Sequence, residues 1–226
     1  MKSRVILLFC FLMSLSGICS SEMSSEAAIP KETLIDQAFS EAIQGGALDE
    51  VKKIIIEGRD PNKPFGDGLT PLHAAVIRNQ EPVVILLLQQ GAKVDAKERT
   101  TGATPLHLTA VYGRDKLAKL LIQKGADVNE RMKFGITPLH TAAQFRQLQV
   151  AELLLNKKAD INRADDEGYT ALHFAAQNGD EETVRVLIRH GADKNRQENL
   201  HNKTPLMIAN EKNHKEVIRI LEGKQP

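Results

Sequence analysis

The sequence contains little cysteine and few aromatic residues. Only two of its 226 residues are cysteine, Cys10 and Cys19, while Trp is absent and aromatic residues make up 4%. After residue 20 the chain therefore has no thiol for a disulfide, a cysteine nucleophile or a Cys-ligated zinc site. An excess of charge of one sign is also missing, since the formal net charge is +1. Near-neutral charge removes the usual reason to expect nucleic acid or an anionic membrane as the main partner.

Residues 1–20 differ in composition from the rest of the chain. Two basic residues precede an apolar stretch at 5–19, and small residues follow it. This layout is typical of a secretory signal peptide, and the stretch is shorter than the roughly 20 residues that span a bilayer. We therefore expect an exported protein, periplasmic or secreted, with an uncleaved membrane anchor as the alternative. A lipoprotein signal is disfavoured because Ile18, not a small residue, precedes Cys19. The longest later apolar run is 83–88, so no membrane insertion is expected after signal removal.

A repeated motif organises the remainder of the chain. Thr-Pro-Leu-His stands at 70–73, 104–107 and 137–140, and related segments follow at 170–173 and 204–207, in steps of 34, 33, 33 and 34 residues. A second motif with Ala at its second position and Asp or Asn at its end recurs at 91–95, 125–129, 158–162 and 191–195. These motifs resemble the ankyrin repeat family, whose period is about 33 residues with a T-P-L-H-x-A signature. The resemblance implies an all-α repeat solenoid, an ankyrin-repeat stack of helix-turn-helix units joined by β-hairpin loops.

The residue types in the motif have physical roles at the ends of helices. Each Thr is expected as an N-cap, each Pro at the first helical position and each His at the third, where a capping-box partner lies. Gly113 and Gly179 are expected in the left-handed conformation that ends the first helix of a unit. The predicted organisation is a signal peptide at 1–20, a polar linker at 21–33 and an ankyrin repeat domain at 34–226, divided into an N-terminal capping repeat at 34–64, repeats at 65–98, 99–131, 132–164 and 165–198, and a C-terminal capping repeat at 199–226.

One repeat departs from the pattern at two positions. Arg146 stands where the first helix usually ends in Gly, and Lys158 stands where the second helix does. A non-glycine residue in a left-handed conformation costs on the order of 1 kcal/mol. The repeat at 132–164 is therefore predicted to be the weakest.

No arrangement of residues indicates catalysis, a metal site or a cofactor. Four histidines recur once per repeat and should lie about 10 Å apart, whereas zinc holds its ligands about 2 Å from one ion; we interpret them as caps and inter-repeat hydrogen-bond partners, His73, His107, His140 and His173. The acidic run at 165–167 is interpreted as a solvated hairpin tip. Motifs for a nucleophile elbow, a zinc helix or a phosphate loop are missing. We expect no enzyme, with an enzyme or enzyme subunit lacking a recognisable motif as the alternative.

The informative residues should be those that the repeat framework leaves free. In the family these lie on the hairpins before the Thr and at the exposed end of the first helix, which together form a protein-binding concave face. Five of the seven aromatic residues after residue 20 map to such positions, and aromatic residues are enriched at interfaces. The alternative is burial against the adjacent hairpin, and Phe65 in particular fits a role in closing the N-terminal repeat. The predicted protein-binding residues are Leu69, Ile77, Tyr112, Phe134, Ile136, Phe145 and Tyr169.

The sequence thus predicts a monomeric, exported, non-enzymatic module that binds a partner protein, with no nucleic acid, small-molecule substrate or cofactor. Two biological roles fit this prediction. The protein either stays in the periplasm or a comparable lumen, where it protects or regulates an exported enzyme, or it is a secreted effector that acts on a host-cell protein.

Overall fold

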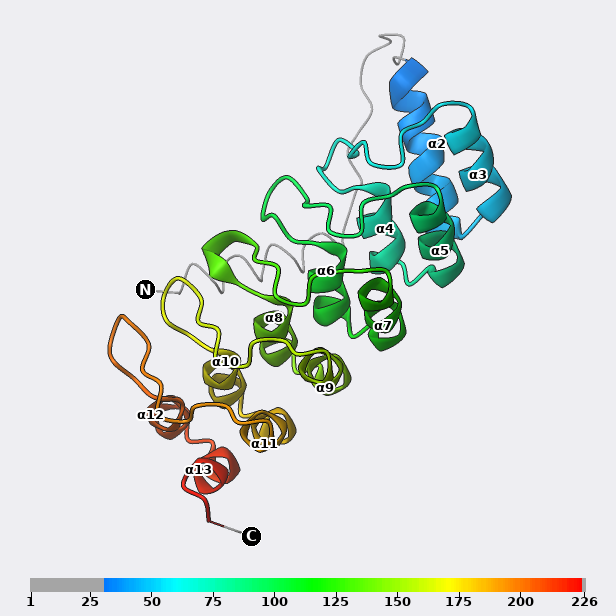
Figure 1. Cartoon of the computed structure of the whole chain (residues 1–226). Helices are drawn as coiled ribbons and strands as arrows, with labels where there is room; N and C mark the ends of the chain where they lie inside the picture. The colour runs from blue at the N-terminus through cyan, green and yellow to red at the C-terminus, as the bar shows by residue number, and fades with distance from the viewer. Residues whose placement is uncertain (1–30, 225–226) are drawn as a thin grey trace. The chain divides into compact units, whose positions relative to one another are not determined.

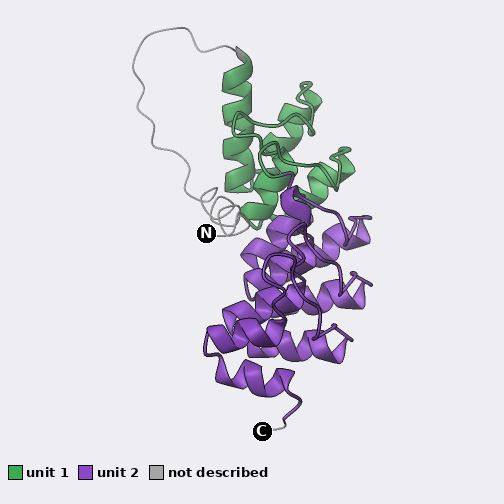
Figure 2. Ribbon diagram, turned by 90° about the vertical axis from the view of Figure 1, so that its left-hand side faces the viewer, with its two compact units in different colours: residues 1–101 green, residues 102–226 purple. Residues whose placement is uncertain are grey.

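A computed structural model describes residues 31–224, which form two compact units (Figures 1 and 2). Unit 1 runs to Thr101 and unit 2 begins at Gly102. The helices of unit 1 are α2 (Lys31–Gly45), α3 (Leu48–Ile56), α4 (Pro71–Ile77) and α5 (Glu81–Gln89). Those of unit 2 are α6 (Pro105–Tyr112), α7 (Asp115–Gln123), α8 (Pro138–Gln144), α9 (Leu148–Asn156), α10 (Ala171–Asn178), α11 (Glu181–Arg189), α12 (Pro205–Glu211) and α13 (Lys215–Leu221), with a 3-10 turn η1 (Lys133–Gly135). The predicted signal peptide and residues 21–30 of the predicted linker lie outside the described residues.

Helices pack in the order expected of a helical repeat. In unit 1, α2 packs on α4 and α3 on α5. In unit 2, the first helices α6, α8, α10 and α12 pack in series, and the second helices α7, α9, α11 and α13 form a parallel series (Figure 1). The predicted all-helical repeat fold is confirmed. Because α2 begins at Lys31, the last three residues of the predicted linker are helical.

The loops between repeats are turns, and residues 31–224 contain no β-strand. Four of these loops, at 65–69, 132–136, 165–169 and 198–203, are closed by a backbone hydrogen bond across them, as between the Phe65 N–H and the Leu69 carbonyl at 2.8 Å or the Asp165 N–H and the Tyr169 carbonyl at 2.8 Å. Neighbouring loops are also joined, since the Asp166 N–H donates to the Phe134 carbonyl at 3.0 Å. The expected hairpins are therefore present as turns too short to form a ladder.

Local chemistry at the helix ends follows the motif. In α4, α6, α8 and α10 the backbone N–H of the N-cap Thr donates to Nδ1 of the His three residues later, at 3.1 to 3.3 Å. Gly113 and Gly179 end α6 and α10 with φ of 65° and 66°. Arg146 and Lys158 adopt the same left-handed region, with φ of 56° and 64°. The sequence prediction for these four positions is confirmed.

Leucine, alanine and valine side chains make up most of the core of each unit. The Leu of each Thr-x-Leu-His motif is buried, as are paired alanines such as Ala142 and Ala143, which let neighbouring helices approach closely. Met207, which occupies the position of His in the other motifs, is 50% exposed. Within 31–224, no helix combines the length and apolar character needed to cross a membrane.

Candidate protein-binding site

The structure separates the predicted binding residues into two groups. Leu69 and Ile136 are 4% and 0% exposed, so the expectation of exposed side chains at these two positions is wrong. Each precedes an N-cap Thr, and its carbonyl closes the loop by accepting from Phe65 or Met132, while its side chain joins the core. The other five residues are partly exposed: Ile77, Tyr112, Phe134, Phe145 and Tyr169.

Two partly exposed aromatic residues in unit 2 occupy equivalent positions at the ends of adjacent first helices. Tyr112 is the last residue of α6, and Phe145 is the C-cap residue of α8. The two helices pack against each other. These rings therefore belong to one face of unit 2, without being part of its buried core.

The two aromatic residues on the loops of unit 2 are placed differently. Phe134 lies in η1 with φ of 62°, a left-handed conformation that the sequence pattern did not predict. The Tyr169 ring packs 5.8 Å from the Phe174 ring and 5.6 Å from the His173 ring, measured between centroids. One side of Tyr169 is thus used in packing, and the remainder is available at the surface.

The recurring histidines of unit 2 join one repeat to the next. His107 Nε2 lies 3.2 Å from the Ile136 carbonyl, His140 Nε2 lies 3.1 Å from the Tyr169 carbonyl, and His173 Nε2 lies 3.2 Å from the Lys203 carbonyl. Since Nδ1 accepts the Thr N–H, the hydrogen-bond pattern assigns the proton to Nε2, which donates. Burial lowers the pKa of His140 to about 4 and lowers that of His173. Both ring nitrogens are engaged, and the predicted inter-repeat role is confirmed.

The acidic run contains one residue that is not solvated, contrary to the sequence interpretation. Asp165 is 5% exposed. Its Oδ1 accepts from the Glu167 N–H at 3.0 Å and the Tyr169 N–H at 2.8 Å, whereas its buried Oδ2 has no hydrogen-bond partner. Burial raises the pKa of Asp165 to about 7. Asp165 turns inward because its carboxylate caps the loop, while the exposed Asp166 pairs with Arg131 at 2.7 Å.

A buried arginine holds the first loop of unit 1. The Arg59 Nε donates to Asp36 Oδ1 at 2.6 Å, and its Nη atoms donate to the carbonyls of Asp60 and Lys63 at 2.6 and 3.0 Å. Its guanidinium lies 5.5 Å from the centroid of the Phe39 ring and 5.6 Å from that of the Phe65 ring. Phe65 is 8% exposed, so the alternative that Phe65 closes the N-terminal repeat is the one observed.

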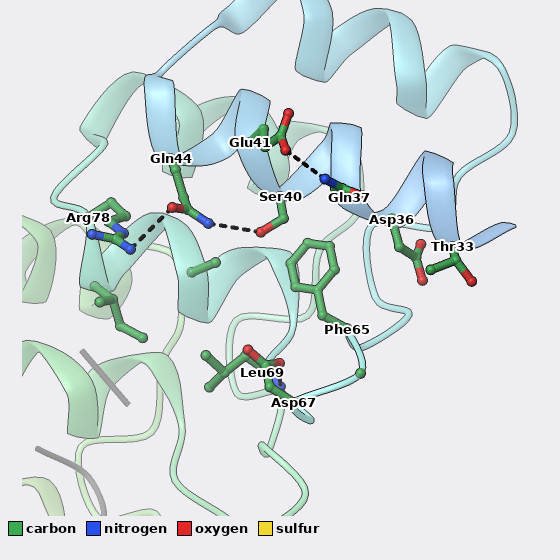
Figure 3. Close-up of a pocket in the computed structure, with 13 residues that line it drawn as sticks. Thr33, Asp36, Gln37, Ser40, Glu41, Gln44, Phe65, Asp67, Leu69 and Arg78 are labelled. Carbon is green, nitrogen blue, oxygen red and sulfur yellow. Dashed lines mark hydrogen bonds between the residues drawn. The ribbon is translucent and has the colours of Figure 1, made fainter. Parts of the chain in front are cut away.

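Unit 1 also contains a pocket of about 680 Å³ between α2, the loop at 65–69 and α4 (Figure 3). We call it the α2 pocket. Polar side chains of α2 form one wall, and Phe65, Leu69, Ala74 and Ile77 contribute apolar surface. Sequence reasoning that followed aromatic residues missed the polar wall. The sequence feature that could have indicated this wall is a stripe of polar residues at helical spacing along α2: Thr33, Asp36, Gln37, Ser40, Glu41 and Gln44.

The comparisons with known proteins agree with the repeat geometry. Residues 39–132, 130–198 and 163–225 match the family model described as ankyrin repeats (3 copies). Myotrophin of Xenopus tropicalis is 39% identical over 57 residues, 25% of this chain and 48% of that protein. Ankyrin repeat domain-containing protein 39 of Homo sapiens is 34% identical over 85 residues, 36% of this chain and 46% of that protein. Palmitoyltransferase Hip14 of Drosophila melanogaster is 38% identical over 55 residues, 24% of this chain and 9% of that protein. The matches thus span less than half of each relative.

Proposed function

Because the chain belongs to the ankyrin repeat family, we propose that it is a non-enzymatic, exported module that binds a partner protein through the face formed by its first helices and loops. The observation that carries this proposal is the pair Tyr112 and Phe145. Their partly exposed rings stand on adjacent first helices of unit 2. Aromatic anchors of this kind dominate the binding energy of many interfaces.

The proposal is tested by a double substitution at these two residues. We expect Tyr112→Ala with Phe145→Ala to weaken partner binding by about 2–4 kcal/mol and to leave the helical circular dichroism spectrum unchanged. The partner is captured by cross-linking in native cells, identified by mass spectrometry and purified. Titration calorimetry then compares the variant with the unsubstituted chain.

A matched control changes partly exposed apolar residues on the second helices of the same unit. Ile122→Ala with Leu153→Ala removes comparable side chains from α7 and α9. We expect this control to retain partner binding. Equal losses in both double variants, or no loss in the Tyr112 and Phe145 variant, would refute the assignment of the binding face.

Export belongs to the same proposal and is supported by the composition of residues 1–20. Fractionation of native cells with intact-mass measurement tests it. A mass that begins near residues 20–22, found outside the cytoplasm, would support export and limit the partner search to exported proteins. A full-length chain in the membrane would indicate an anchor, and one in the cytosol would overturn the export proposal.

A further inference from the structure

We propose that the α2 pocket of unit 1 binds an extended segment of a partner protein in which a lysine or arginine lies close to an apolar side chain. This inference rests on the proposed function, because it names the kind of segment that the module recognises. It adds a second contact region to the aromatic residues of unit 2 and gives that region a charge preference.

The shape of the pocket suits a linear segment. Its α2 wall runs from Thr33 to Gln44, eleven residue steps that correspond to about 16 Å along a helix. An extended chain of about five residues has that length. Several wall residues, among them Gln37 and Glu41, are exposed, so the pocket is open along one side and a chain can enter and leave it at both ends.

The pocket is organised before anything binds. Along α2, the Gln37 amide donates to Glu41 Oε1 at 3.1 Å and the Gln44 amide donates to Ser40 Oγ at 3.1 Å. Arg78 of α4 in turn donates to Gln44 Oε1 at 3.1 Å (Figure 3). Side chains already held in place lose less conformational entropy when a partner binds.

The apolar surface lies opposite this polar wall. Figure 3 shows Phe65 and Leu69 across the pocket from Ser40 and Gln37. Phe65 is immobilised by the Arg59 guanidinium and by the Phe39 ring, whose centroid is 6.1 Å away. Ile77 of α4 is partly exposed and provides contact area for an apolar side chain of the partner.

The charges favour a basic segment. Three carboxylates line the pocket, and Asp36 is neutralised by Arg59. Glu41 accepts from an uncharged amide and Asp67 accepts from the Leu69 N–H at 2.9 Å, and within residues 31–224 neither carboxylate is paired with a cation. They lie on opposite sides of the pocket (Figure 3). Complementary charge at these two sites gives specificity and faster association.

Arg78 lies at the other end of the α2 wall from Asp36 and Thr33 (Figure 3). Its guanidinium faces the end of the pocket near Gln44. The Arg78 cation lies at one end of the pocket, and the Glu41 and Asp67 carboxylates lie nearer its middle. This arrangement of charges determines the orientation of the bound segment. Its basic residue lies toward Glu41 and Asp67, and its carbonyl or acidic groups lie toward Arg78.

The test uses fluorescently labelled peptides of about nine residues, longer than the roughly five that fill the wall, and the purified full chain. One peptide has a central leucine flanked by lysines, a second has glutamate in place of lysine, and a third has serine. Fluorescence anisotropy measures binding at low and high salt. We expect the lysine peptide to bind, the other two to bind at least about fivefold more weakly, and salt to reduce the difference.

The decisive variant removes two charges and keeps the local hydrogen bonds. Glu41→Gln with Asp67→Asn should weaken binding of the lysine peptide about fivefold. The matched control, Asp49→Asn with Glu57→Gln, removes the same charge from exposed residues of unit 1 outside the pocket, and we expect it to bind like the unsubstituted chain. Equal binding of the three peptides, or equal losses in both double variants, would overturn the inference.

The same peptides separate this inference from the proposed function. The Tyr112→Ala with Phe145→Ala variant should still bind the lysine peptide, since both changes lie in unit 2. Partner binding that depends on Tyr112 and Phe145, together with no binding of the lysine peptide, would refute the pocket and leave the proposed function standing. The opposite result is that the lysine peptide binds in a charge-dependent way, but no partner is found whose binding depends on Tyr112 and Phe145. This result would refute the unit 2 face and support the pocket.

Discussion

The N-terminal repeat of unit 1 and the repeats of unit 2 stabilise their loops with different side chains. In unit 2 a neutral histidine caps its own helix and donates to a carbonyl of the following repeat, as His140 does to Tyr169. In unit 1 the first loop is held by the cationic Arg59, which is neutralised by Asp36 and lies against two rings. A histidine anchor needs no counterion, whereas an arginine anchor requires a carboxylate on α2. The difference shows how a capping repeat that lacks the Thr-Pro-Leu-His motif acquires both a charged anchor and the polar α2 wall beside it.

The largest expected effect comes from removing the arginine anchor. Arg59→Met should lower the free energy of unfolding of unit 1 by about 2–4 kcal/mol, because Asp36 loses the cation that neutralises it. Hydrogen exchange measured by mass spectrometry should show faster exchange in α2 and α4, with little change in α9 and α11. The control Arg78→Met removes an exposed arginine of the same unit and should cost less than about 0.5 kcal/mol. Equal effects of the two substitutions would remove the distinction between the units.

A smaller effect is expected from the buried carboxyl group of unit 2. The pKa of Asp165 in the folded state is about 7, above its ordinary value of 3.8. The folded state therefore binds the proton more tightly between those values, and this contribution to stability falls as pH rises from about 4 to about 7. Asp165→Asn should raise the free energy of unfolding by about 1–2 kcal/mol at about pH 8 and leave it nearly unchanged below about pH 4.

Urea unfolding at both pH values measures this effect. His140 contributes with the opposite sign, since burial lowers its pKa from 6.5 to about 4 and stability is lost as pH falls through that interval. Its contribution cancels in the difference between the Asp165 variant and the unsubstituted chain. The exposed Asp166→Asn should change stability by less than about 0.5 kcal/mol at either pH. A gain that is the same at both pH values would contradict the assigned titration.

The smallest expected effect concerns the left-handed residue after the second helix of a repeat. Unit 1 has Gly91 at this position with φ of 86°, and unit 2 has Lys158 with φ of 64° in the repeat at 132–164. Lys158→Gly should raise the free energy of unfolding by about 1 kcal/mol. The control Lys157→Gly changes a residue with φ of −99° and should give no gain. A lower midpoint for Lys158→Gly in thermal unfolding would show that strain at this residue does not limit the repeat.

Sequence reasoning was most successful where the physical cause is local. The capping role of Thr and His and the left-handed conformation at Arg146 depend on residues within one turn of chain, and both are observed. It failed where burial depends on residues far away in the chain. Leu69 and Ile136 occupy loop positions that the repeat pattern leaves free, yet packing against neighbouring elements buries them.

Periodicity by itself determined the family, the pairing of helices and the identity of the cap residues, because each follows from chemistry repeated every 33 or 34 residues. Only the tertiary structure decided which side chains remain accessible, that Asp165 is buried, and that Arg59 pairs with Asp36 while Glu41 and Asp67 line the α2 pocket without a cationic partner among residues 31–224. Accessibility and charge compensation depend on which segments meet in space. A repeat pattern specifies that neighbouring repeats will pack, but the side chains that depart from the pattern determine what each surface presents.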